Sequence, residues 1–335
     1  MKYPLHKNLC EPIPLFKRYM EIVIIFASCE YSSHMRYLAI IIACLCLFLL
    51  PLQLIKKNPT SPELQTISTN ACPILIQVEG ITEPLALEDY IVGVVSAEMP
   101  SSFHLEALKA QAIAARTFAL KTTNYGETPI KPTVSHQAFI PKEKQSNNER
   151  VVKAVKETES QILSYQNQLI TAMFFSTSNG ATESAENYSG FEIPYLTSTE
   201  SIGDSVSPKF QQQQTYTLSE WNKAFGFVWS AEQLQSIVLE ENETKRIQSM
   251  KTSQHKWTGR EVREILKLPS TDFDISIDEE LITVTTKGYG HGVGMSQYGA
   301  NAMANEGKKA EYILFHYYQQ TEIKNFQTLH SACLK

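Results

Sequence analysis

One helical face in residues 87–100 combines four aliphatic side chains with a single carboxylate. At 3.6 residues per turn, this face carries Leu87, Ile91, Val94, Val95 and Glu98. Pro100 ends the helix two residues later. Because burial disfavours the charged form of a carboxyl group, Glu98 is a candidate general acid. The alternative is that Glu98 lies in a frayed last turn and points to water, and the pattern alone favours neither interpretation.

A glycine-rich segment near the C-terminus is the second feature that could do chemistry. Its alternating glycines are Gly288, Gly290, Gly292 and Gly294. Such spacing lets a backbone turn sharply and approach a ligand closely. The segment lacks the Lys-Ser/Thr of a Walker loop and the third glycine of a dinucleotide-binding turn. Tyr289 and His291 within it, and Gln297 after it, favour a site-lining loop. The alternative is a tight connection without a ligand, in which the His291 imidazole binds the loop backbone.

Four further side chains are candidate binding residues. Arg116 interrupts an alanine-rich helix, and an arginine is rarely buried without a carboxylate or a substrate oxygen to bind. Ser176 and Asn179 lie in a polar loop at a strand end, where functional groups are common. His136 is expected at most to line the groove that would hold a ligand. No His-Glu-x-x-His or Cys-x-x-Cys motif occurs in the sequence, so we expect no metal and no cofactor.

The elements that must position these residues predict an α+β fold. A helix ending at Leu120 is expected to be capped by Ser101 or Ser102. Strands are identified by alternation or by short aliphatic runs, and helices by the 3.6-residue period. Strands are predicted at 74–78, 161–165, 169–175 and 281–286, and further helices at 87–98, 148–158, 259–268, 296–305 and 309–320.

The distribution of charge argues against nucleic acid as a partner. The 335 residues include 30 Lys or Arg and 35 Asp or Glu, a net charge of −5. Residues 1–57 hold seven of the basic and only three of the acidic residues, so the remainder is more acidic and has no basic stripe. Of the six cysteines, only Cys72 and Cys333 lie beyond residue 46, which excludes a disulfide framework.

An uncharged apolar run at 37–55 predicts one N-terminal transmembrane helix. Its length is close to the ~20 residues that cross a bilayer, and no Ala-x-Ala-like cleavage site follows it. Met35-Arg36 directly before the run is a natural start, so residues 1–36 are expected to be an unstructured extension. Residues 56–72, rich in Pro, Ser and Thr, are predicted to be a linker.

Two motifs resemble the signature of the stage II sporulation protein D family. The first is Val-Val-Ser-Ala-Glu-Met-Pro at 94–100 with its continuation at 106–117, and the second lies at 288–300. The resemblance runs from about residue 74 to 323. It implies a membrane-anchored lytic transglycosylase that cuts peptidoglycan glycan strands in endospore-forming bacteria, with Glu98 as the catalytic residue. Some relatives bind zinc in the region of His136, but this chain has no cysteine there.

The composition along the chain indicates a domain organisation, and the resemblance implies partners and a location. We expect a mixed helix/sheet catalytic domain at 73–207 and 271–325, with an accessory subdomain at 208–270. Arg116, His136, Ser176, Asn179, Tyr289, His291 and Gln297 are expected to bind or surround the sugar. The implied partners are the amidase stage II sporulation protein P and the membrane protein stage II sporulation protein M. The implied location is a single-pass anchor with the domain outside the cytoplasm, on the mother-cell side of the engulfing septum.

Three classes of function follow from these features. The first is a lytic transglycosylase in which Glu98 cleaves the bond between N-acetylmuramic acid and N-acetylglucosamine, leaving a 1,6-anhydro end on strands expected to be peptide-stripped. The alternative is a non-catalytic peptidoglycan-binding or scaffold protein. The third is a serine acyl-hydrolase, since Ser253-Gln-His-Lys256 matches Ser-x-x-Lys. We regard that match as a coincidence, because Lys-Thr-Gly and Gly-x-Ser-x-Gly are missing.

Overall fold

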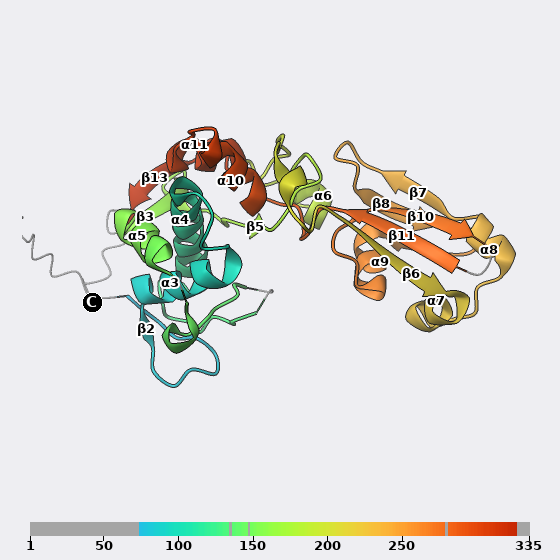
Figure 1. Ribbon diagram of the computed structural model, residues 1–335, viewed down its shortest axis with the longest axis horizontal. Coiled ribbons are helices and arrows are strands. Elements are labelled where there is room, and N and C mark those ends of the chain that lie inside the picture. The colour runs from blue at the N-terminus through green and yellow to red at the C-terminus, as the bar shows by residue number, and fades with distance from the viewer. Residues whose placement is uncertain (1–73, 134–135, 147, 279–280, 327–335) are drawn as a thin grey trace, which may run out of the picture. The chain divides into compact units, whose positions relative to one another are not determined.

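The fold is described for most of the chain beyond its N-terminal quarter. The computed structural model describes residues 74–133, 136–146, 148–278 and 281–326 (Figure 1). The expected N-terminal extension, transmembrane helix and linker lie outside the described residues. Within the described ranges, helices are mixed with several small sheets, which confirms the α+β prediction to that extent. None of the helices in those ranges has both the length and the hydropathy needed to cross a membrane.

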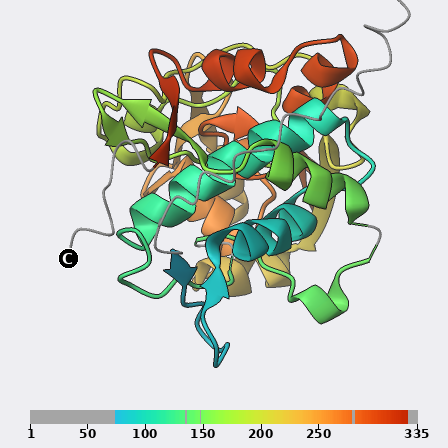
Figure 2. The same ribbon diagram turned by 90° about the vertical axis from the view of Figure 1, so that its left-hand side faces the viewer.

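A long alanine-rich helix, α4 (Leu105–Thr122), lies at the centre of the first hydrophobic core (Figures 1 and 2). Its alanines are buried, and their small side chains let neighbouring helices approach closely. Figure 2 shows α3 beside the long helix, as the contacts between the two require. The helices that contact α4 are α3 (Leu87–Glu98), α5 (Glu149–Glu157), α10 (Gln297–Asn305) and α11 (Ala310–Tyr317).

The start of α4 differs from the prediction. His104 is the N-cap, and its Nδ1 accepts a hydrogen bond from the Glu106 N–H at 3.2 Å. Ser101 and Ser102 instead lie in a turn that is closed by the Phe103 N–H donating to the Pro100 carbonyl. The serine prediction was wrong because this turn occupies the residues directly after Pro100, so the helix begins later.

Three small sheets flank the helices of the first core. Strand β3 pairs antiparallel with β4 and with β13, β1 pairs antiparallel with β2, and β5 pairs parallel with β12. Gln166 and Asn167 have positive φ values, which suits the two-residue turn between β3 and β4. The strands are β1 (Leu75–Ile76), β2 (Leu85–Ala86), β3 (Gln161–Tyr165), β4 (Gln168–Leu169), β5 (Phe174–Phe175), β12 (Met295–Ser296) and β13 (Glu322–Asn325).

A second hydrophobic core is built from aromatic side chains and two three-stranded antiparallel sheets. The sheets have the orders β10-β11-β6 and β7-β8-β9. Trp221 and Trp229 are fully or almost fully buried in this core. Its elements are β6 (Gln211–Thr217), α7 (Leu218–Phe225), α8 (Ala231–Gln235), β7 (Val238–Glu241), β8 (Ile247–Lys251), β9 (Lys256–Thr258), α9 (Gly259–Leu266), β10 (Asp272–Asp278) and β11 (Leu281–Lys287).

The second core extends beyond residue 270, where the sequence analysis ended the accessory subdomain. Strand β11 pairs with β10 on one side and with β6 on the other. Phe273, Ile282 and Val284 from these two later strands are buried in the second core. The remaining short elements connect the two cores or lie in loops. They are α6 (Ala185–Ser189) and the 3₁₀ turns η1 (Lys142–Lys144) and η2 (Asp204–Val206).

Candidate functional site

Glu98 is the last residue of α3, and its side chain is partly buried rather than directed into bulk water. The Ala138 N–H donates a hydrogen bond to Glu98 Oε1 at 2.7 Å. Burial raises the pKa of Glu98, while the Ala138 N–H and the Gln297 side chain offset part of that rise because they favour the carboxylate. Glu98 therefore keeps its proton to higher pH than a free glutamate, as a general acid must.

The segment that supplies the Ala138 N–H lies directly against α3 because Gly93 has no side chain. A Cβ at Gly93 would overlap the Phe139 ring and lie 2.9 Å from the Ile140 carbonyl oxygen. The Ile140 N–H donates to the Gly93 carbonyl at 3.2 Å. Phe139 also stacks on Tyr90, with the ring centroids 5.4 Å apart. One glycine inside a helix thus sets the position of the group that binds Glu98.

The second group that acts on Glu98 is the side chain of Gln297, which lies about 200 residues later in the sequence. It is the first residue of α10 and is only 4% exposed. Its amide is close enough to lower the Glu98 pKa, yet Nε2 has no hydrogen-bond partner of normal geometry among the described residues. Ser296 caps this helix and donates to the buried Asp204 carboxylate, which also accepts the Ser178 N–H at 2.7 Å. The start of α10 is therefore fixed, with the Gln297 amide beside Glu98.

Two further buried polar groups on these helices lack partners among the described residues. Gln111 on α4 is fully buried with both amide atoms unpaired, and Ser96 on α3 has an unpaired hydroxyl. Gln111 lies one turn before Ala115, whose carbonyl accepts a hydrogen bond from the Gln137 amide at 3.1 Å. An unpaired buried polar group costs about 1–3 kcal/mol, which hydrogen bonds from a ligand would offset. Neither residue was predicted from the sequence, although a glutamine within the alanine-rich run at 107–115 is a local signal for Gln111.

The structure places His136 and Ser176 beside the residues that surround Glu98. His136 lies two residues before Ala138, and its Nδ1 accepts a hydrogen bond from the Lys131 N–H within a local turn. The Ser176 carbonyl accepts the Tyr298 N–H at 3.1 Å, directly after Gln297. Both side chains are partly exposed. The role of each in binding stays a prediction.

Asn179, Tyr289 and His291 make their contacts elsewhere. The Asn179 amide donates to the Thr244 carbonyl and to Asp272, so it joins the loop after β5 to the second core. Tyr289 is 38% exposed, and the Lys209 ammonium lies over its ring. None of these contacts brings the three side chains to Glu98.

His291 is held by the backbone on both sides of its ring. Its Nδ1 accepts the Val293 N–H at 3.1 Å, and a second hydrogen bond joins the ring to the Phe174 backbone. Burial, and secondarily the positive charge of Arg263, lowers the pKa of His291 to about 4. The imidazole is therefore neutral near pH 7, and its contacts agree with the structural alternative considered above.

Arg116 is fully buried and forms a bidentate ion pair with Glu88 in the first turn of α3. Its Nε and Nη2 atoms lie 2.8 and 2.6 Å from the two carboxylate oxygens. Nη1 donates to the Gln161 carbonyl at 3.0 Å. These contacts join α3, α4 and β3 at the end of α3 that is remote from Glu98. The structure does not bring Arg116 to the candidate catalytic residue.

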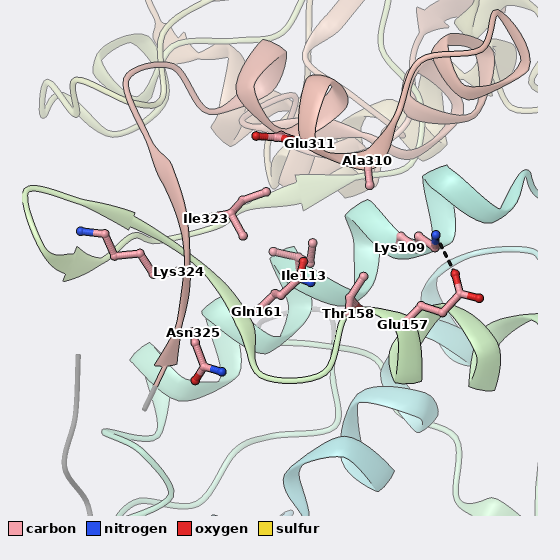
Figure 3. Close-up of a pocket in the computed structure, with 10 residues that line it drawn as sticks. All are labelled: Lys109, Ile113, Glu157, Thr158, Gln161, Ala310, Glu311, Ile323, Lys324 and Asn325. Atoms are coloured by element: carbon pink, nitrogen blue, oxygen red, sulfur yellow. Dashed lines mark ion pairs between the residues drawn. The ribbon is translucent and has the colours of Figure 1, made fainter. Parts of the chain in front are cut away.

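A cavity of about 500 Å³ between α4, α5 and the C-terminal strand does not include Glu98 (Figure 3). Figure 3 shows Lys109 and Glu157 at its edge, joined by an ion pair of 2.7 Å. Both charges are thereby matched, and none of the predicted site residues lines this space. In the part of the chain that the structure describes, no three His, Cys, Asp or Glu side chains gather as metal ligands.

Comparison with known proteins defines the class of protein to which this site belongs. Residues 77–165, which include Glu98 and the segment that binds it, match the family model SpoIID, "Stage II sporulation protein". The chain is 37% identical to stage II sporulation protein D of Bacillus subtilis (strain 168) over 80% of its length and 84% of that protein. It is 40% identical to the protein of the same name from Bacillus amyloliquefaciens over 80% of each chain. The chain belongs to the stage II sporulation protein D family.

A more distant similarity extends to a protein with a different name. The chain is 29% identical to the protein named "Amidase enhancer" of Bacillus subtilis (strain 168). The match covers 70% of this chain and 40% of that protein.

Proposed function

We propose that this protein is a lytic transglycosylase that cleaves peptidoglycan glycan strands during engulfment in sporulation. The observation that supports this most directly is the state of Glu98. Its carboxyl group is partly buried with a raised pKa, and no second carboxylate or cation contributes to that pKa among the described residues. Hydrolytic glycosidases use a pair of carboxyl groups, whereas one is enough for an internal transfer to a hydroxyl of the substrate itself.

The proposed reaction uses Glu98 first as an acid and then as a base. Protonated Glu98 donates its proton to the oxygen between N-acetylmuramic acid and N-acetylglucosamine, and the C1–O bond breaks with an oxocarbenium-like transition state. The Glu98 carboxylate then accepts the proton of the muramic acid 6-hydroxyl as that oxygen bonds to C1. The products are a free N-acetylglucosamine end and a 1,6-anhydro end, without addition of water.

The groups around Glu98 have defined roles in this proposal. The Ala138 N–H orients the carboxyl group and stabilises the carboxylate that forms after proton transfer. The Gln297 amide supplies a donor at the same place.

A variant of Glu98 tests the reaction. Glu98→Gln keeps the size of the side chain but cannot donate or accept the proton, so we expect release of anhydro-ended products from purified, peptide-stripped strands to fall at least about 10³-fold. Mass spectrometry of the digest measures the anhydro ends. Undiminished release by the variant would refute the proposal. Equal strand binding by wild type and variant, with no product from either, would favour the non-catalytic scaffold instead.

We also propose the cellular setting that the family membership suggests. The apolar run at 37–55 would anchor the protein in the mother-cell membrane, with the domain outside the cytoplasm and peptide-stripped strands supplied by the amidase stage II sporulation protein P. We propose the membrane protein stage II sporulation protein M as the third member of a complex with this protein and the amidase. Similarity to a protein named amidase enhancer supports the link to an amidase. If the protein no longer co-purifies with the amidase after residues 37–55 are removed, this result would support the anchor as the element that brings the two proteins together.

A further inference from the structure

A cavity of about 170 Å³ lies between the glycine-rich segment, α6 and the start of α9, apart from Glu98. Residues of both cores line it, including Tyr188, Arg260, Arg263 and His291. A water molecule occupies about 30 Å³ in the liquid, so the cavity has room for a carboxylate and the few carbon atoms attached to it.

Two arginines line this cavity. Arg260 and Arg263 are one turn apart on α9 and therefore lie on the same side of the helix. The exposed Arg260 lies over the Tyr188 ring at 5.1 Å and pairs with Glu264 at 3.0 Å. Arg263 is more buried, its Nε donates to the Leu268 carbonyl, and it forms no ion pair among the described residues. A partly buried guanidinium without a carboxylate is unusual and is suited to an anionic ligand.

No carboxylate near the cavity forms an ion pair with Arg263 in the part of the chain that the structure describes, although Glu264, the partner of Arg260, acts on it at longer range. His291 is neutral near pH 7, because burial and the Arg263 charge lower its pKa to about 4. Glu183 is buried, and both of its oxygens are occupied by hydrogen bonds from neighbouring residues. The donors are the Ser184 N–H, the Asn187 and Asn242 amides and the Thr244 hydroxyl. Glu183 keeps its charge, but its oxygens are engaged by these donors, so Arg263 is left without a hydrogen-bonded carboxylate among the described residues.

We infer that the Arg260–Arg263 cavity is a second binding site, for the free carboxylate of the lactyl group on a muramic acid residue. The inference rests on the proposed function, since it assumes a peptidoglycan strand as the ligand. A guanidinium group binds a carboxylate through two parallel N–H bonds, which gives both affinity and orientation. In strands that carry stem peptides this carboxylate is consumed in an amide bond, so the cavity selects stripped strands at a position other than the cleaved bond.

Calorimetric titration with small sugars tests the site independently of cleavage. We expect wild-type protein to bind N-acetylmuramic acid more tightly than its neutral methyl ester or N-acetylglucosamine. Arg263→Gln is expected to weaken binding of the acid roughly tenfold, whereas Lys267→Gln removes the same charge from the residue after α9, outside the cavity, without effect. Arg263→Lys keeps the charge but not the bidentate geometry, so it should give an intermediate loss even if the glutamine variant fails to fold.

Several outcomes would overturn the inference. These are equal binding of the acid, the ester and N-acetylglucosamine, an unchanged affinity in Arg263→Gln, or binding of inorganic phosphate without binding of N-acetylmuramic acid. Cleavage of stripped strands, measured on the same preparations, keeps the two proposals apart. Cleavage without carboxylate binding refutes only the second site, and carboxylate binding without cleavage refutes only the transglycosylase.

Discussion

The carboxyl group of Glu98 is subject to two opposing influences at the scale of single residues. Partial burial raises its pKa, and the Ala138 N–H and Gln297 side chain lower it. The two donors come from segments that are distant in sequence, and each acts on the same charged form. The balance between them sets the pH range in which Glu98 can donate its proton.

Removal of the Gln297 amide should change the pKa of Glu98. Gln297→Leu takes away a group that favours the carboxylate, so the pKa of Glu98 should rise further. Because kcat/KM depends on the protonated acid, the alkaline limb of its pH profile should move to higher pH. We expect the activity at the optimum to fall about tenfold, since a donor to the developing carboxylate is lost. Gln213→Leu, an exposed position on β6, is the matched control. A limb that stays in place or moves to lower pH would contradict this explanation.

At the scale of elements, the position of one loop against one helix decides whether Glu98 has its partner. Segment 136–140 lies against α3 through the Gly93 carbonyl and through the stacking of Phe139 on Tyr90. Glycine in a helix interior is usually about 1 kcal/mol less favourable than alanine. Here the close approach of the loop requires it.

Gly93→Ala tests this close approach. The added methyl would displace Phe139 and Ile140, so we expect a net loss of about 1–3 kcal/mol in the free energy of unfolding despite the better helix propensity. Activity should fall by more than the loss of folded protein accounts for, because the Ala138 N–H moves with the loop. The double variant Gly93→Ala/Phe139→Leu makes room for the methyl and should recover part of both losses. Urea unfolding and release of anhydro ends are the measurements, and a stabilised, fully active Gly93→Ala would refute the argument.

At the scale of the whole described region, the two hydrophobic cores meet through polar contacts. Arg246 Nη2 donates to the Ala181 carbonyl at 2.9 Å, and Glu183 accepts hydrogen bonds from Asn242 and Thr244. Polar interfaces of this kind hold two units together less strongly than a continuous apolar core. We therefore expect the cores to unfold in separate steps.

Trp221→Ala tests this expectation, because the chain's three tryptophans all lie in or against the second core. Trp221 is fully buried against Phe225, Trp229 and Tyr216. Its loss should destabilise the second core by about 3–5 kcal/mol. Tryptophan fluorescence should then change at a lower urea concentration than the far-ultraviolet circular dichroism of the helices around α4. Leu314→Ala in the first core is the reciprocal control. Coincident transitions in both variants would show that the cores form one cooperative unit.

The sequence by itself determined the features that depend on neighbouring residues. The helix that ends at Glu98, the strand at 281–286 and the helix before Pro269 follow from local hydrophobic period and from proline. Glu98 itself was identifiable because a carboxylate interrupts an aliphatic face.

The tertiary structure decided which residues meet. Ala138 reaches Glu98 across 40 positions of sequence, and Gln297 approaches it from the start of α10. Arg116 and Asn179 instead use their donors on Glu88, Thr244 and Asp272. A local pattern specifies the face of an element on which a side chain lies. Its partner depends on how separate elements pack, and this packing is set by shape and buried area across the whole core.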